Sequence, residues 1–329
     1  MSTAIEINDL SKRYGSFTAV DRLDLSIEEG EVFGFLGHNG AGKSTTINML
    51  LDFVRPTAGN IEIFGHDIQS NSVETRKQMG VLPEGYSVYS GLTGRQHVEF
   101  AMESKGVDGE PLAFLDRVGI TDAADRDADG YSKGMSQRLV LAMALVGEPD
   151  LLILDEPTSG LDPAGAKAMR EIILEENERG ATVFFSSHIL EQIEAVADRV
   201  GIMYEGQLAA VDTIDGLREM AGGETKILVT LGAGIEGRPE MVQTGDGAAA
   251  QSETVGDGGE ASHLATIDAI DAVENAWVED DGRYGITCIK EDRMDILVAL
   301  NELDVEVRDF TIEEPSLEDL FVEYTRRSE

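Results

Sequence analysis

The sequence predicts an α/β fold with a helical insertion and a second, small α+β domain. Short strand-like runs alternate with turns over residues 1–84, and helical periodicity dominates residues 85–146. Strand-like and helical runs alternate again beyond that stretch, which is typical of an α/β core. We expect a large first domain over residues 1–222 and the small domain over residues 223–329.

Residues 1–84 are expected to form mainly strands. The strand-like runs, in order, are "AIEINDL", "VDRLDLSI", "EVFGFLG" and "GNIEIFG". One clear helix is expected among them, because "STTINMLL" carries apolar residues at helical spacing.

The insertion of residues 85–146 carries two helical runs, "RQHVEFAME" and "PLAFLDRVG". After it, expected strands and helices alternate in the order "DLLILDEP", "GAKAMREIILEENERG", "TVFFSSH", "ILEQIEAVADRV" and "GIMYEGQLAAV". The insertion therefore interrupts a single α/β core.

The second unit begins after about residue 222 with the strand-like run "TKILVTL". Residues 232–262 are Gly-rich, acidic and nearly free of large apolar side chains, so we expect a mobile surface loop there. The runs beyond it, which indicate a small α+β domain, are "GRYGITCIK", "RMDILVALNEL", "VEVRDFTI" and "SLEDLFVEYT".

A Gly-rich turn joins an expected strand to an expected helix in "GFLGHNGAGKSTTINMLL", residues 34–51. Gly37, Gly42, Lys43 and Ser44 fit the pattern G-x-x-x-x-G-K-[ST]. In this pattern backbone N–H groups cradle phosphates, the lysine reaches the outer phosphates and the hydroxyl contacts Mg²⁺. A flexible turn before a helix is the alternative, but the flanking strand and helix lie where phosphate binding needs them.

Two acidic residues follow the buried strand-like run "LLIL". Asp155 and Glu156 would lie at the carboxyl edge of a parallel sheet, where α/β folds place ligands. Asp155 would hold the Mg²⁺ that Ser44 also contacts, and Glu156 would orient or deprotonate the attacking water. The alternative is that two acids merely end a strand.

A third phosphate-handling element is expected at "YSKGMSQRLVLAMALV". Ser132 and Gly134 begin a strongly apolar helix, and serine is a favourable N-cap. The free N–H groups at such a helix start can bind an anion. Many helices begin with serine, so a serine cap alone does not indicate a phosphate site. The position of this helix, just upstream of "LLILDEP", is what favours such a site here.

The composition is strongly acidic. The chain of 329 residues has 63 Asp and Glu against 26 Lys and Arg, a formal net charge of −37. This charge argues against binding of nucleic acid through its phosphate backbone. A partner of basic character is one explanation, and a solubility device similar to that of halophilic proteins is the simpler one.

Disulfides, zinc sites and membrane helices are not expected. Cys288 is the single cysteine, and no Cys/His cluster has zinc spacing. No window approaches the roughly 18 uncharged apolar residues that a membrane helix needs. We expect a cytoplasmic protein, and any membrane role would have to come through a partner.

These motifs together resemble the ATP-binding subunit of an ABC transporter. The segments similar to family motifs are "GHNGAGKST" (Walker A), "YSKGMSQR" (signature), "LLILDEP" (Walker B), "SGLD" (D-loop) and "SSHIL" (switch histidine). The resemblance covers about residues 5–211. It implies a P-loop NTPase (RecA-like) core with an antiparallel β subdomain and a helical insertion.

The resemblance also implies a set of residues for ATP and Mg²⁺. Glu156 would be the catalytic carboxylate and His188 would contact the γ-phosphate, while Ser44, Asp155 and Glu84 would face the metal. The residues that would bind ATP are Tyr14, stacked on adenine, with Gly37, His38, Asn39, Gly40, Ala41, Gly42, Lys43, Ser44, Thr45, Ser132 and Gly134.

Two positions depart from the family pattern. The signature has Lys133, Gly134 and Met135 where the family has Gly-Gly-Gln. Glu84 stands where the family has the glutamine of the Q-loop, and a carboxylate there could bind Mg²⁺ more strongly yet repel phosphates.

The implied function is ATP-driven transport, with export favoured because the tail resembles the C-terminal extension of subunits that serve two-component export permeases. Two copies would pack head to tail, with ATP covered by the signature of the partner copy. Residues 85–146 would bind a separate permease, which would hold the chain at the inner face of the cell membrane. The tail would support the dimer or regulate it.

A soluble, non-transport ABC-type ATPase is the alternative function. A DNA-repair ATPase would need a long coiled coil between Lys43 and Ser132, and that stretch is too short for one. Translation-factor ATPases usually carry two such cores, whereas this chain has one Walker A motif. Fold alone does not separate the remaining possibilities.

Overall fold

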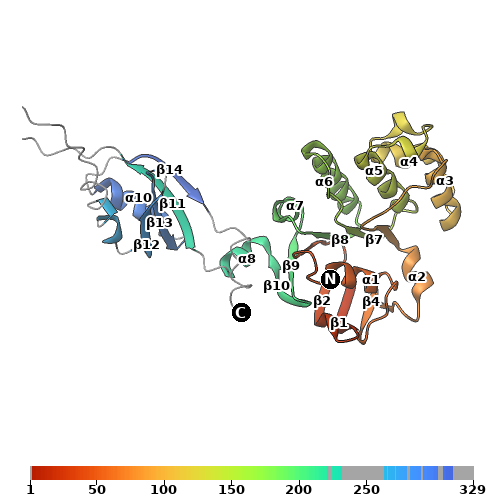
Figure 1. Ribbon diagram of the computed structural model, residues 1–329, viewed down its shortest axis with the longest axis horizontal. Helices are drawn as coiled ribbons and strands as arrows, with labels where there is room; N and C mark the ends of the chain where they lie inside the picture. The colour runs from red at the N-terminus through yellow and green to blue at the C-terminus, as the bar shows by residue number, and fades with distance from the viewer. Residues whose placement is uncertain are drawn as a thin grey trace, which may run out of the picture. The chain divides into compact units, whose positions relative to one another are not determined.

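The protein is described here by a computed structural model, which covers residues 2–220, 224–231, 263–264, 266–270, 272–279, 282–289, 292–302 and 307–313. The described chain divides into two compact units, one within residues 1–217 and one from Arg218 onward (Figure 1). The expected insert of residues 232–262 and the run "SLEDLFVEYT" lie outside the described residues.

The first unit contains two sheets. The antiparallel sheet has the order β2-β1-β4-β5, formed by β2 (Phe17–Glu28), β1 (Thr3–Tyr14), β4 (Ala58–Ile63) and β5 (His66–Asp67). The larger sheet has the order β10-β9-β3-β8-β7-β6, formed by β10 (Gln207–Thr213), β9 (Arg199–Tyr204), β3 (Val32–Leu36), β8 (Thr182–Ser187), β7 (Leu151–Asp155) and β6 (Met79–Leu82).

Five strands of the larger sheet, β9, β3, β8, β7 and β6, run parallel, and β10 pairs antiparallel with β9. Strands β3 and β7 are buried at every position, as expected of apolar runs in a sheet covered on both faces. Because the strands are parallel, the segments that follow β3, β6, β7 and β8 all leave the sheet at the carboxyl ends of the strands. The predicted site residues that follow these strands lie there.

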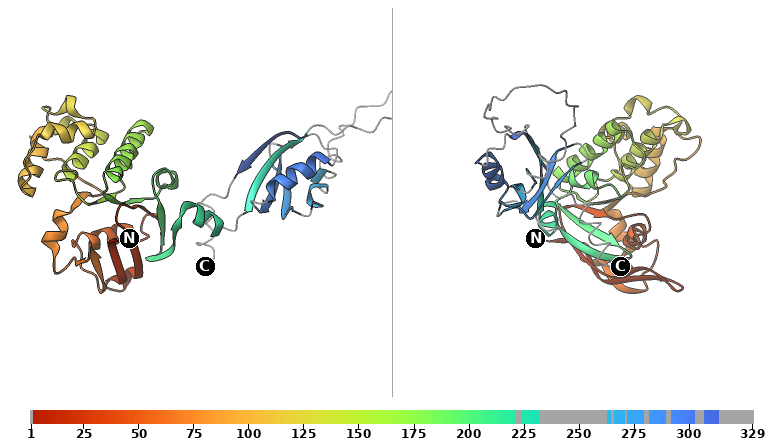
Figure 2. Two further views of the ribbon diagram at one scale, coloured as in Figure 1. Left: turned by 180° about the vertical axis from the view of Figure 1, so that it is seen from behind. Right: turned by 60° about the vertical axis from the view of Figure 1, so that its left-hand side comes forward.

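Helices α1 to α7 connect these strands, and α8 follows β10 at the boundary between the two units. They are α1 (Lys43–Leu50), α2 (Ser72–Lys77), α3 (Gly94–Lys105), α4 (Pro111–Arg117), α5 (Lys133–Ala144), α6 (Pro163–Glu178), α7 (Leu190–Glu194) and α8 (Ile214–Met220). Helices α3, α4 and α5 pack on one another and lie at the opposite end of the unit from the antiparallel sheet (Figures 1 and 2).

One hydrophobic core joins the two sheets through α1. Ile5 and Leu25 of the antiparallel sheet, Phe35 and Ile153 of the parallel sheet, and Ile47 of α1 belong to the same buried cluster. Helix α1 is therefore fixed by packing against both sheets, and so is the turn that precedes it.

The expected α/β class, with its antiparallel subdomain and helical insertion, is confirmed. Some short elements were not expected: helix α2 makes a second helix within residues 1–84, strand β6 lies beside β7, and β5, α8 and β12 match no predicted run. The helix expected through "ILEQIEAVADRV" ends at Glu194, because Asp198 exchanges hydrogen bonds with the Val32 backbone (2.8 Å each) and the chain enters β9.

The second unit is a small α+β fold. Its antiparallel sheet has the order β12-β13-β11-β14, formed by β12 (Asn275–Val278), β13 (Tyr284–Ile289), β11 (Glu224–Leu231) and β14 (Val307–Glu313), and α10 spans Arg293–Glu302. Its core includes Ile227, Ile286, Ile296 and the Cys288 thiol, all fully buried. Within the described part of the chain, no helix is long and apolar enough to cross a bilayer.

Candidate functional site

The Gly-rich turn between β3 and α1 needs glycine at particular positions. Gly40 and Gly42 have φ angles of +90° and +114°, which L side chains rarely adopt. A Cβ on Gly42 would lie 2.6 Å from the Ala19 carbonyl oxygen, and one on Gly37 would lie 2.6 Å from that of Met203. The backbone itself therefore shapes the turn and leaves its N–H groups open for an anion.

Lys43 begins α1 and folds back over this turn. Its ammonium is buried, donates to the Gly37 carbonyl at 2.6 Å and lies 3.5 Å from a carboxylate oxygen of Glu156. A buried cation with one carboxylate partner and a ring of backbone dipoles is suited to bind phosphate oxygens.

A cavity of about 360 Å³ opens over the turn. Its lining residues are Phe17, Ala19, His38, Asn39, Gly40, Gly42, Lys43, Ser44, Thr45, Glu84 and Glu156. The structure thus brings Glu84 and Glu156, which follow β6 and β7, to the same cavity as the Gly-rich turn.

Asp155 is the last residue of β7 and Glu156 follows it, so both lie at the carboxyl end of a buried strand as the sequence predicted, and both are buried. The Ser186 hydroxyl donates to Asp155 Oδ1 at 2.6 Å and accepts from the Glu156 N–H at 3.0 Å. Burial raises the pKa of Asp155, the negative charges of Glu84 and Glu156 raise it further, and the Ser186 hydrogen bond and Lys43 oppose the rise. A cation at this position would relieve the cost of burying that charge.

Glu156 is held in an unusual conformation beside His188. Its φ angle is +51°, in the left-handed region, and its Oε2 lies 2.9 Å from His188 Nδ1. The Ser44 hydroxyl donates to Glu84 Oε2 at 3.5 Å. Direct contacts therefore join Lys43 and His188 to Glu156, and a separate contact joins Ser44 to Glu84.

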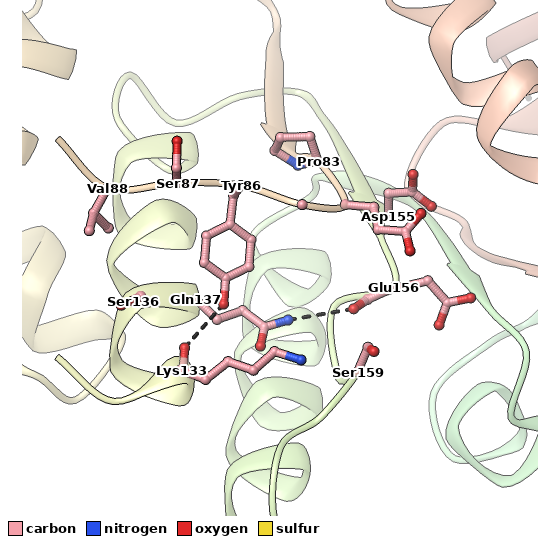
Figure 3. A pocket seen from close by; sticks show the side chains of 12 residues that line it. Pro83, Tyr86, Ser87, Val88, Lys133, Ser136, Gln137, Asp155, Glu156 and Ser159 are labelled. Atoms are coloured by element: carbon pink, nitrogen blue, oxygen red, sulfur yellow. Dashed lines mark hydrogen bonds between the residues drawn. The ribbon is translucent and has the colours of Figure 1, made fainter. Parts of the chain in front are cut away.

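Ser132 caps α5 as predicted, and its hydroxyl accepts from the Met135 N–H at 3.3 Å. Neither Ser132 nor Gly134 lines the cavity over the Gly-rich turn. The start of α5 borders a second cavity of about 780 Å³, shown in Figure 3, which also contains Glu84 and Glu156 in its lining. The Tyr86 hydroxyl donates to the Lys133 carbonyl there at 3.1 Å.

Two aromatic residues flank the turn between β1 and β2, and only one of them lines the cavity over the Gly-rich turn. Tyr14, at the end of β1, is half exposed, and the Lys12 ammonium lies 5.0 Å from its ring centroid. Phe17, at the start of β2, lines the cavity and is 63% exposed. Phe17 was not predicted from the sequence. An aromatic residue two positions after the turn glycine Gly15 was the pattern that could have indicated it.

The oxygen donors fit a magnesium ion that arrives with phosphates. The described residues contain no group of three or more His, Cys, Asp or Glu side chains that could hold a metal alone. Mg²⁺ in nucleotide sites typically takes one or two carboxylates plus phosphate oxygens and water. The Ser44 hydroxyl in the cavity over the Gly-rich turn and the Asp155 carboxylate in the second cavity, which shares Glu84 and Glu156 with the first, are donors of this kind.

Comparison with known proteins gives consistent matches. A family model described as "ABC transporter" matches residues 20–159. The bacitracin transport ATP-binding protein BcrA of Bacillus licheniformis is 43% identical over 222 residues, which cover 67% of this chain and 72% of the relative. The daunorubicin/doxorubicin resistance ATP-binding protein DrrA of Streptomyces peucetius is 32% identical over 327 residues, which cover 98% and 92%.

Solved structures match over the first unit. A structure described as the ATP-binding subunit of an ABC transporter is 31% identical, with a TM-score of 0.62 over 67% of this chain and 94% of that one. The dimeric ATP-binding cassette MJ0796, bound to ADP and Pi, is 22% identical with a TM-score of 0.59, over 64% of this chain and 98% of that one, and shows a shared fold.

Proposed function

The chain belongs to the ABC transporter family of ATP-binding proteins, and we propose that its ATP hydrolysis powers a separate membrane permease in export. Relatives that align with nearly the whole chain are named for resistance to daunorubicin, and others for bacitracin transport. The permease would place the chain at the inner face of the cell membrane. The described part of the chain has no membrane-spanning helix of its own.

We assign the nucleotide to the cavity over the Gly-rich turn. Lys43 and the backbone N–H groups of residues 37–44 bind the outer phosphates, which replace the Glu156 carboxylate as the partner of the lysine. His188 lies at hydrogen-bond distance from Glu156 and keeps its carboxylate facing the cavity. Tyr14 is the proposed adenine contact, and Phe17 offers a second aromatic surface at the cavity.

Glu156 is the proposed general base. A carboxylate beside the phosphate site can orient a water molecule and accept its proton as the water attacks the γ-phosphate. Its contact with His188 leaves the other carboxylate oxygen, Oε1, near Lys43. Once phosphates engage Lys43, that oxygen becomes available to water.

Ser44, Asp155 and Glu84 are the proposed magnesium residues. When bound, Mg²⁺ would neutralise charge on the phosphate oxygens. Asp155 is oriented for this by the Ser186 hydroxyl, and Glu84 is oriented through Ser44.

A head-to-tail dimer accounts for the place of Ser132 and Gly134. They lie at a helix start, where N–H groups can bind an anion, but do not line the cavity of their own chain. In a dimer they would cover the nucleotide of the partner copy, and hydrolysis would reopen the pair. The relative MJ0796 is described as dimeric.

The observation that carries this proposal is the contact of Glu156 with both Lys43 and His188 at 3.5 and 2.9 Å. The experiment compares ATP hydrolysis and ATP binding in Glu156→Gln and Lys43→Ala. Glu156→Gln should keep binding and lose about 10²-fold or more in hydrolysis, as expected for a lost general base. Lys43→Ala should lose binding. Wild-type hydrolysis by Glu156→Gln would refute the assignment, and co-purification with a multi-span membrane protein tests the permease.

A further inference from the structure

Glu156 occupies a backbone conformation that must be imposed by its surroundings. Among the described residues, it is the one buried non-glycine residue with a positive φ angle. Such a conformation is strained and persists only where neighbouring groups hold it. The groups that hold this turn therefore decide where the carboxylate points.

Two buried side chains hold the Glu156 turn by its backbone. The Ser186 hydroxyl, from β8, accepts from the Glu156 N–H at 3.0 Å. The Gln137 amide, from α5, donates to the carbonyl oxygens of Pro157 and, at 3.5 Å, Glu156. Figure 3 shows Gln137 extending from α5 toward this turn.

Gln137 makes these contacts at an energetic cost. It is only 2% exposed, and its Oε1 is buried without a hydrogen-bond partner in the described structure. The amide nitrogen must face the two carbonyls, so the oxygen is left pointing elsewhere. A buried acceptor without a partner loses its hydrogen bonds to water on folding, a cost that an apolar side chain of the same size would avoid. Gln137 therefore lowers stability relative to an apolar side chain, but its amide holds the Glu156 turn through hydrogen bonds that an apolar side chain could not make.

Gln137 also lies close to the helix start that the dimer would use. Ser132 caps α5, and five residues of helix correspond to about 7.5 Å along the axis. A helix moves as a rigid element, so a contact at Ser132 and a contact at Gln137 are linked mechanically. The Tyr86 hydroxyl ties the segment after Glu84 to the same turn of α5 through the Lys133 carbonyl.

We propose that Gln137 is a positioning residue for Glu156, and that it transmits the engagement of the α5 start with a partner's nucleotide to the proposed base. The inference rests on the proposed role of Glu156. Gln137 acts through hydrogen bonds to the turn backbone and does not contact ATP.

The test is steady-state ATP hydrolysis by Gln137→Met and Gln137→Asn. Methionine keeps the length and removes the donor, and asparagine keeps the amide but is one methylene too short to reach. Both variants should lose about 10- to 100-fold in kcat, the scale of an angstrom-sized misplacement, with KM for ATP within about twofold. The asparagine variant covers the case in which methionine does not fold.

Gln78→Met is the matched control. Gln78 also has a buried Oε1 without a partner among the described residues, but it precedes β6, at the opposite end of the parallel strands from Glu156, which follows β7. Its substitution should leave kcat unchanged. An equal loss of kcat in Gln78→Met would mean that the Gln137 effect reflects general destabilisation.

A double variant separates this inference from the proposed function. In the Glu156→Gln background, Gln137→Met should cause no further loss, because both changes remove the same base. A further 10-fold loss there, or wild-type kcat in Gln137→Met, overturns the inference while leaving Glu156 as the base. Wild-type hydrolysis by Glu156→Gln alone overturns the proposed function instead.

Discussion

Ser186→Ala removes the hydroxyl that joins the two carboxylates of the site. Ser186 is fully buried, donates to Asp155 Oδ1 at 2.6 Å and accepts from the Glu156 N–H at 3.0 Å. A hydrogen bond to a charged group contributes about 1.5–3 kcal/mol, and an orphaned buried N–H costs about 1–3 kcal/mol. The free energy of unfolding should therefore fall by about 2.5–6 kcal/mol.

The same variant should change the pH dependence of hydrolysis. The Ser186 hydrogen bond lowers the pKa of Asp155, whereas burial raises it. Without the hydroxyl, that pKa rises further, and the proposed magnesium residue becomes protonated at a higher pH. The acid limb of the pH–rate profile should move to higher pH.

Urea unfolding and a pH–rate profile are the two assays. Thr182→Val is the control on the same strand, since the Thr182 hydroxyl accepts one bond from the Gly30 N–H at 3.0 Å at the far end of β8. It should cost about 1 kcal/mol and leave the pH profile in place. A loss below about 1.5 kcal/mol in Ser186→Ala, with an unmoved acid limb, would refute the reasoning.

The remaining predictions concern charge and the Gly-rich turn. Burial raises the pKa of Asp155 in the folded protein above its unfolded value of 3.8, so the ionised carboxylate destabilises the fold at neutral pH. Asp155→Asn should therefore raise the melting temperature at pH 7. This increase should vanish below pH 3.8, where the carboxyl is protonated in both the folded and the unfolded state. The net charge of −37 predicts a melting temperature that rises with KCl toward molar concentrations, where screening acts over about 3 Å; full stability in dilute buffer would contradict this. Gly42→Ala should weaken ATP binding, measured by calorimetry, at least about tenfold. Gly30→Ala is the control: Gly30 has a φ angle of +77° with open space around it, so its substitution should lower the free energy of unfolding by about 1–2 kcal/mol and leave the ATP affinity unchanged.

Local motifs were enough to predict the residues that converge on the site. The G-x-x-x-x-G-K-[ST] pattern identified Lys43 and Ser44, and the acids after an apolar strand identified Asp155 and Glu156. The structure places these side chains around the cavity or directly beside it. Each prediction needed only the order of elements along a short stretch of chain.

Contacts between distant residues were not predictable in the same way. Gln137 and Ser186 reach Glu156 across 19 and 30 positions of sequence. Ser186 faces Asp155 because β7 and β8 pair in a register that places these residues opposite one another. Strand register and helix packing set such contacts, and no local pattern states them. Helix α2 and strand β6, with six and four residues, are also too short for periodicity to reveal.

The most direct test of the central claim is the ATP-dependent association of Glu156→Gln, measured by light scattering with and without Mg-ATP. Because this variant binds ATP but does not hydrolyse it, the account predicts that it accumulates as a dimer only with Mg-ATP. Lys43→Ala, which loses the buried cation of the phosphate site, should stay monomeric under both conditions. A Glu156→Gln variant that binds Mg-ATP and remains monomeric would contradict the claim that ATP closes two copies of this chain and hydrolysis reopens them.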